Sequence, residues 1–113
     1  MPGNEYHSYQ KSSGYGMPGV LGTKDDVALA ALLEAKKNGK LPAIVGVNNG
    51  IFVKNTYGTS GTSKFIGHVV VVEDIDTSKK PPIFMVRDPN NAMLSPMPQD
   101  KFYECMTWAS TRK

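Results

Sequence analysis

The chain has 113 residues, of which 40% are hydrophobic and 20% charged, and its formal net charge at pH 7 is +3. This length fits one domain with one core. No apolar run approaches the roughly 20 residues that a membrane-spanning helix needs, and the polar N-terminal segment predicts no signal peptide, so we expect no contact with a membrane. The single cysteine, Cys105, excludes an internal disulfide and a Cys-rich zinc site. Phosphate-loop and dinucleotide motifs are also absent, so we expect no metal and no cofactor.

The N-terminal part of the chain divides into an arm and the start of the domain. Residues 1–22 are rich in glycine, proline and tyrosine, which predicts an irregular arm, and residues 23–113 are expected to form a single domain. Thr23–Asn38 has the pattern of a long helix, with Thr23 as the N-cap, acidic residues in the first turn and Gly39 as the stop. We expect its apolar face to pack on a sheet.

Short apolar runs predict the central part of that sheet. Leu41–Val47 is continuously apolar, which is typical of a central strand that is buried on both faces. Asn48–Gly50 predicts a turn, and Ile51–Val53 predicts another short strand. Lys54–Phe65, rich in Gly, Thr and Ser, predicts a loop of a length that is usually functional or mobile.

The second half of the chain contains the clearest strand pair. His68–Val72 and Ile83–Val86 are apolar and β-branched, and the polar connection between them, with its Pro-Pro pair, predicts two antiparallel strands. Pro89–Pro98 holds three prolines and is predicted to be irregular, whereas Pro98–Trp108 is typical of a short helix. The predicted fold class is α+β, with a small, mainly antiparallel sheet, one long helix packed on it and a short C-terminal helix.

Two side chains with catalytic chemistry lie at the ends of this strand pair. His68 opens the first strand and Asp88 closes the second, so antiparallel pairing brings them to the same edge of the sheet. A carboxylate in that position can orient a general-base histidine. The structural alternative is a histidine that packs at the sheet edge and an aspartate that caps the turn at Asp-Pro-Asn. His7, the other histidine, is expected to be exposed and incidental.

The order of these segments resembles the C-terminal half of papain-like cysteine peptidases. The resemblance covers roughly residues 22–108 and is carried by GKLPAIVGV at residues 39–47, GHVVVV at residues 67–72 and FMVRDPN at residues 84–90. It is closest to bacteriocin-processing peptidases and to papain-fold toxin or deamidase modules of bacterial effectors. In that family the histidine is the general base and the residue before proline orients it, which implies these roles for His68 and Asp88.

The resemblance further implies a protein or peptide substrate, an immunity or inhibitor protein as a partner, and action in the cytoplasm of the producing or the target cell. We expect the remaining substrate contacts to come from the loop before His68 and from the end of the second strand, namely from Ser60, Thr62, Arg87 and Asn90.

The chain departs from the family pattern at the nucleophile. The family places a cysteine at the start of a helix upstream of the strand pair, whereas Cys105 lies downstream of His68 and is expected to be a small buried residue. Three hypotheses follow. The chain is a fragment without its nucleophile-bearing helix; or it is a degenerate papain-like domain that binds a peptide or protein; or it is a small basic ribonuclease. In the ribonuclease, His68 acts as acid or base, Arg87 or a lysine stabilises the phosphorane, and RNA supplies its own 2′-hydroxyl.

Overall fold

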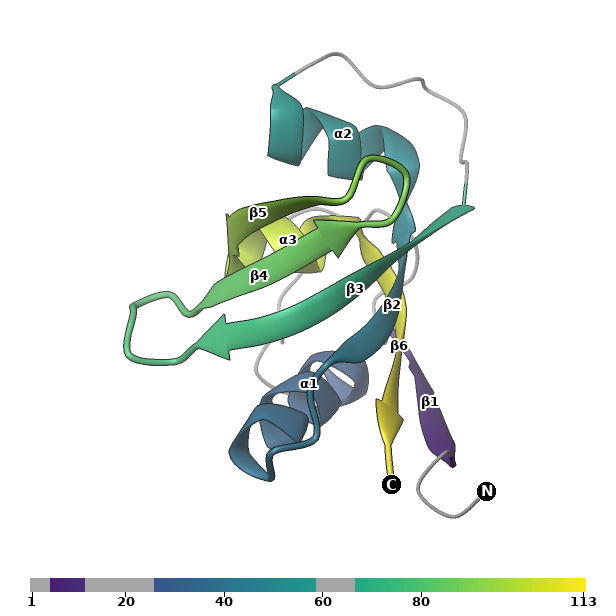
Figure 1. Cartoon of the computed structure of the whole chain (residues 1–113), viewed down its shortest axis with the longest axis vertical. Helices are drawn as coiled ribbons and strands as arrows, with labels where there is room; N and C mark the ends of the chain where they lie inside the picture. Colours follow the sequence, from purple (N-terminus) through teal and green to yellow (C-terminus); the bar gives the residue numbers. More distant parts are fainter. Residues whose placement is uncertain (1–4, 12–25, 59–66) are drawn as a thin grey trace.

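The strands of the protein pair into one antiparallel sheet (Figure 1). The computed structural model describes residues 5–11, 26–58 and 67–113. Within these residues the elements are, in chain order, β1 (Tyr6–Gln10), α1 (Val27–Lys37), β2 (Ala43–Asn48), α2 (Asn49–Tyr57), β3 (Gly67–Asp76), β4 (Ile83–Asp88), β5 (Met93–Pro98), α3 (Gln99–Cys105) and β6 (Met106–Arg112). The sheet order is β1-β6-β2-β3-β4-β5, and every pairing is antiparallel.

The α+β class and the antiparallel sheet are therefore as predicted, but the described helices are short. Helix α1 has 11 residues, α2 has 9 and α3 has 7. Helix α1 begins at Val27 instead of Thr23, because Asp26 has an extended backbone and acts as the N-cap, accepting a hydrogen bond of 2.9 Å from the amide of Leu29. Thr23 itself lies outside the described residues. Gly39, with φ +68°, follows the helix end as expected.

One face of the sheet carries the core. Side chains alternate between the two faces of a strand, and a single buried cluster joins one set of them to all three helices. This set includes Val45 of β2, Val70 and Val72 of β3, and Phe84 and Val86 of β4. Four large apolar side chains of the other strand positions are exposed: Tyr6, Ile44, Val69 and Leu94.

Several segments differ from the sequence-based prediction. The predicted turn at Asn48–Gly50 and the predicted strand at Ile51–Val53 are instead helix α2, because the Asn48 side chain caps the amides of Gly50 and Ile51 and Phe52 enters the core. Residues 93–98, predicted to be irregular, form β5. Their prolines are tolerated because β5 is an edge strand, which needs hydrogen bonds on only one side.

The two ends of the chain pair with each other. The irregular arm predicted for residues 1–22 is corrected at Tyr6–Gln10, which forms edge strand β1 beside β6. Strand β6 was predicted as helix from Met106 to Trp108, but the described helix ends at Cys105. Figure 1 shows the consequence: the start of β1 and the end of β6 lie at the α1 end of the sheet, whereas α2 lies where β3 begins and β4 ends.

Candidate functional site

The structure brings His68 and Asp88 into contact. The two strands pair with Val71 opposite Arg87, so Asp88 is a diagonal neighbour of His68 on the helix-covered face. His68 Nε2 lies 2.9 Å from Asp88 Oδ1, and the side chains are 13% and 8% exposed. The two side chains that were predicted to meet at this sheet edge thus form a hydrogen-bonded pair that is largely buried.

Further hydrogen bonds surround the Asp88 carboxylate. The backbone amide of Asn90 donates to Oδ1 at 3.0 Å, and the Tyr57 hydroxyl donates to Oδ2 at 3.3 Å. Burial by itself would raise the pKa of Asp88, but the hydrogen bonds from Asn90, His68 and Tyr57 together with the charge of His68 outweigh it and lower the pKa below the ordinary value. Asp88 is therefore ionised at neutral pH.

The charge state of Asp88 determines which nitrogen of His68 is the basic one. An ionised carboxylate only accepts hydrogen bonds, so neutral His68 must carry its proton on Nε2, the nitrogen that faces Asp88. The lone pair is then on Nδ1, which has no hydrogen-bond partner among the described residues. Phe52 of α2 packs against the imidazole with ring centroids 6.1 Å apart. The arrangement can accept a proton at Nδ1.

Asp88 also has the structural role that the sequence left open. Its side chain accepts the amide of Asn90, and its carbonyl accepts the amides of Asn91 and Ala92 at 3.3 and 2.7 Å. The same residue therefore shapes the β4–β5 turn and contacts His68, so turn capping and the histidine contact occur together.

Not all of the residues predicted to contact the substrate lie beside His68 and Asp88. Arg87 points to the opposite face of β4 from Asp88, where its Nε contacts Glu73 and its Nη1 donates to the carbonyl of Ala92 at 2.8 Å. The structure does not bring Arg87 to His68. Asn90 meets the pair through its backbone amide, and its side chain is exposed. Ser60 and Thr62 lie outside the described residues.

Sequence reasoning missed the contributions of α2 to this site. Phe52 and Tyr57 were assigned to a strand and a loop because the run is short and weakly periodic. Two signals could have identified the helix: Asn48 as an N-cap, and Gly58 as a left-handed residue directly after Tyr57, with φ +74°.

Cys105 is not an accessible nucleophile. It is fully buried at the end of α3, and its Sγ lies 3.2 Å from the carbonyl of Phe102. Burial raises the pKa of the thiol far above its ordinary value, which disfavours the reactive thiolate. Its predicted role as a small buried residue is confirmed.

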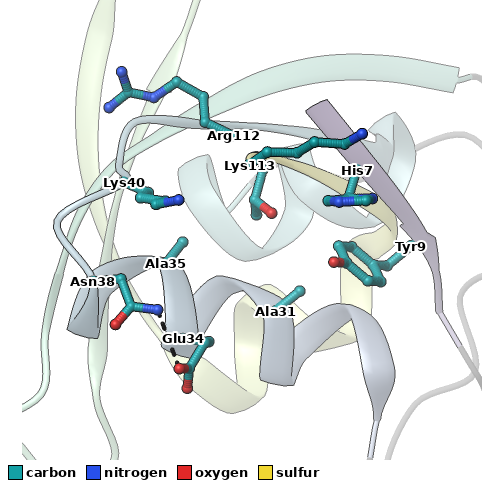
Figure 2. Close-up of a pocket in the computed structure, with 10 residues that line it drawn as sticks. His7, Tyr9, Ala31, Glu34, Ala35, Asn38, Lys40, Arg112 and Lys113 are labelled. Atoms are coloured by element: carbon teal, nitrogen blue, oxygen red, sulfur yellow. Dashed lines mark hydrogen bonds between the residues drawn. The ribbon is translucent and has the colours of Figure 1, made fainter. Parts of the chain in front are cut away.

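A surface pocket of about 340 Å³ lies at the opposite end of the strands, between α1, β1 and the end of β6. Figure 2 shows His7 and Tyr9 facing Asn38 and Lys40 across it, while the guanidinium of Arg112 points away. His7 is exposed, as predicted. Neither His68 nor Asp88 lines this pocket.

The described residues contain no group of three His, Cys, Asp or Glu side chains that could bind a metal ion. No helix within the described ranges is long and apolar enough to cross a membrane. Comparison of the chain with protein-family models, with curated proteins and with solved structures finds no match.

Proposed function

We propose that this chain carries the general-base half of a papain-like hydrolase or deamidase site, with His68 as the base and Asp88 as the residue that orients it. The observation that supports this most directly is the 2.9 Å contact from His68 Nε2 to an ionised, buried carboxylate. That contact directs the basic Nδ1 away from Asp88.

In the proposed reaction a thiol loses its proton to Nδ1 of His68 as its sulfur attacks the carbonyl carbon of an amide. The tetrahedral intermediate collapses when its C–N bond breaks, and the leaving amine or ammonia takes the proton from the imidazolium. Water then releases the acid from the thioester. Because Cys105 is buried, the thiol would come from another polypeptide segment. Glutamine side chains or peptide bonds of a protein are the substrates in this proposal, and an immunity protein is a partner of the toxin form.

A ribonuclease is the second candidate, favoured by the absence of an accessible thiol in a chain of net charge +3. RNA brings its own nucleophile, the 2′-hydroxyl, and His68 Nδ1 could accept that proton. The placement of Arg87 on the other face of β4 removes one of the two cations considered for the phosphorane, so this candidate requires a lysine in that role.

The test replaces His68 by glutamine and offers two substrates, a glutamine-containing peptide with ammonia release as the readout, and total RNA. If His68 is the base, H68Q lowers the rate by about 10²- to 10⁴-fold, the usual contribution of general-base catalysis, on whichever of the two substrates the wild-type protein consumes. His7→Gln is the matched control, because His7 is exposed and far along the strands from Asp88, and it should leave the rate unchanged.

The outcome also separates the candidates. Ammonia release that requires His68 and an added cysteine-bearing segment supports the hydrolase, whereas RNA cleavage by the chain itself supports the ribonuclease. An H68Q protein that keeps full activity contradicts the assignment of His68 as a base. If the wild-type protein consumes neither substrate, and wild type and H68Q bind a peptide or protein partner with the same affinity, the degenerate binding domain is the better description.

A further inference from the structure

The Tyr57 hydroxyl lies between the Asp88 carboxylate and the turn that follows it. It donates to Asp88 Oδ2 at 3.3 Å and accepts a hydrogen bond of 3.0 Å from Asn91 Nδ2. Since the lone pairs of the hydroxyl face Asn91, its hydrogen is directed at the carboxylate. The orientation of the Asn91 amide is itself set, because its oxygen accepts the amide of Met93 at 3.0 Å.

The two carboxylate oxygens of Asp88 have different partners. Oδ1 accepts from His68 and from the amide of Asn90, whereas Tyr57 is the donor that the described residues provide to Oδ2. The rotation of a carboxylate about its terminal torsion is otherwise broad. A donor at Oδ2 therefore restricts this rotation and keeps Oδ1 aimed at His68 Nε2.

Tyr57 is placed by rigid neighbours. It is the last residue of α2, directly before the left-handed Gly58, whose amide bonds to the carbonyl of Lys54 at 3.1 Å. Its ring meets that of Phe52 edge-on, with centroids 6.3 Å apart, and Phe52 is fully buried against the His68 ring. One phenylalanine thus holds both Tyr57 and His68 at fixed positions.

We infer that Tyr57 is a positioning residue of the His68–Asp88 pair, and that its hydroxyl, oriented by Asn91, holds the Asp88 carboxylate in the rotation that keeps neutral His68 protonated on Nε2. The effect of Tyr57 on catalysis rests on the proposed function of His68 as a base. The effect of Tyr57 on the Asp88 carboxylate and on the His68 tautomer can be tested without a substrate.

The experiment compares wild-type protein with Tyr57→Phe, which removes only the hydroxyl and keeps the ring packing against Phe52. The readouts are the ¹⁵N shifts of the His68 imidazole, which report the Nε2–H tautomer, and the ¹³C titration of the Asp88 carboxyl. We expect Y57F to reduce the population of the Nε2–H tautomer and to raise the pKa of Asp88, because a hydrogen bond that lowers it is lost. Asn91→Ala should shift both signals in the same direction by a smaller amount.

Tyr9→Phe is the control, since Tyr9 is half-buried in the distant pocket and its hydroxyl should not affect His68. On the substrate identified for the protein, Y57F should lower kcat about tenfold with KM unchanged, less than the loss of the base itself. A Y57F protein with wild-type ¹⁵N and ¹³C signals overturns the inference, whatever its activity. If Y57F shifts these signals but H68Q keeps full activity, the positioning inference stands and the proposed function fails.

Discussion

The described residues hold two clusters in which a buried carboxylate, a tyrosine hydroxyl and a basic side chain lie together. The His68 cluster consists of His68, Asp88 and Tyr57, and the Lys11 cluster consists of Lys11, Asp26 and Tyr103. Asp88 is 6% exposed and Asp26 is 1% exposed, so burial alone does not distinguish them. They differ in what the basic group contacts.

In the Lys11 cluster the basic group, Lys11 Nζ, makes hydrogen bonds that stabilise the fold. Lys11 Nζ donates to the carbonyls of Tyr103 and Glu104, at 2.7 and 3.4 Å, near the C-terminal end of α3, where a positive charge is favourable, and it lies 4.3 Å from the centre of the Tyr103 ring. Asp26 caps α1 and accepts the Tyr103 hydroxyl at 3.2 Å. This cluster joins the residue after β1 to α1 and α3.

In the His68 cluster the basic atom is Nδ1 of His68, and the fold does not use it for a hydrogen bond among the described residues. The carboxylate contacts Nε2 of the imidazole and accepts the tyrosine hydroxyl. We therefore expect substitutions in the Lys11 cluster to reduce stability and substitutions in the His68 cluster to reduce activity more than stability.

The largest effect on stability is expected for Asp26→Ala. It removes the N-cap of α1, one hydrogen bond of the buried Tyr103 hydroxyl and a negative charge near Lys11, which together should lower the free energy of unfolding by about 3 kcal/mol. Urea unfolding monitored by circular dichroism measures this. Asp100→Ala, which removes an exposed carboxylate from the first turn of α3, should cost at most about 0.5 kcal/mol. Equal losses for the two variants would contradict the structural role of the Lys11 cluster.

Lys11→Met should have the next largest effect. Methionine matches the length and apolar stem of lysine but cannot donate to the carbonyls of Tyr103 and Glu104, so we expect a loss of about 2 kcal/mol in the free energy of unfolding. Burial lowers the pKa of Lys11, opposed by nearby acidic groups that include Asp26 and Glu104, so part of the lost bonding is offset by relief of desolvation. The exposed Lys101→Met is the control and should be near neutral. A Lys11→Met protein as stable as wild type would show that the cluster is replaceable by apolar packing.

The two clusters also differ in how well their contacts could be predicted from the sequence. His68 and Asp88 were predicted together because both belong to the strand pair whose period and β-branched composition are clear, and antiparallel pairing fixes which ends meet. Tyr57 was not predicted, because its position depends on a short helix whose stability comes from Phe52 in the core.

The Lys11 cluster could not be predicted from local patterns. Lys11 is 92 residues from Tyr103 in the chain, and a lone lysine after a tyrosine-rich segment is ordinarily exposed. Strand β1, which places it, pairs with β6, and the first three residues of β6 were assigned to the predicted helix Pro98–Trp108. Contacts between the two ends of a chain are beyond what periodicity in a short window can show.

The smallest effect on stability is expected for Asp88→Asn, and its pH dependence sharpens the contrast. Asp88 has a pKa below that of the unfolded chain, so its ionised form stabilises the fold. This contribution is fully present above the ordinary carboxyl pKa of about 4 and is lost as the pH falls through the lower folded pKa. D88N lacks it at every pH.

The difference in unfolding free energy between wild type and D88N should thus be about 1 kcal/mol at pH 7 and should shrink below about pH 4. Asp74 and Asp76 also have lowered pKa values, through hydrogen bonds from Lys36 and Ser78, but both proteins contain them and the subtraction cancels their contributions. The same D88N protein should lose activity at least tenfold at pH 7, because a neutral amide oxygen can still accept from His68 Nε2 but no longer supplies the negative charge that stabilises the imidazolium formed in the reaction. If D88N costs several kcal/mol but leaves activity unchanged, the His68 cluster is structural like the Lys11 cluster, and the distinction between the two clusters is lost.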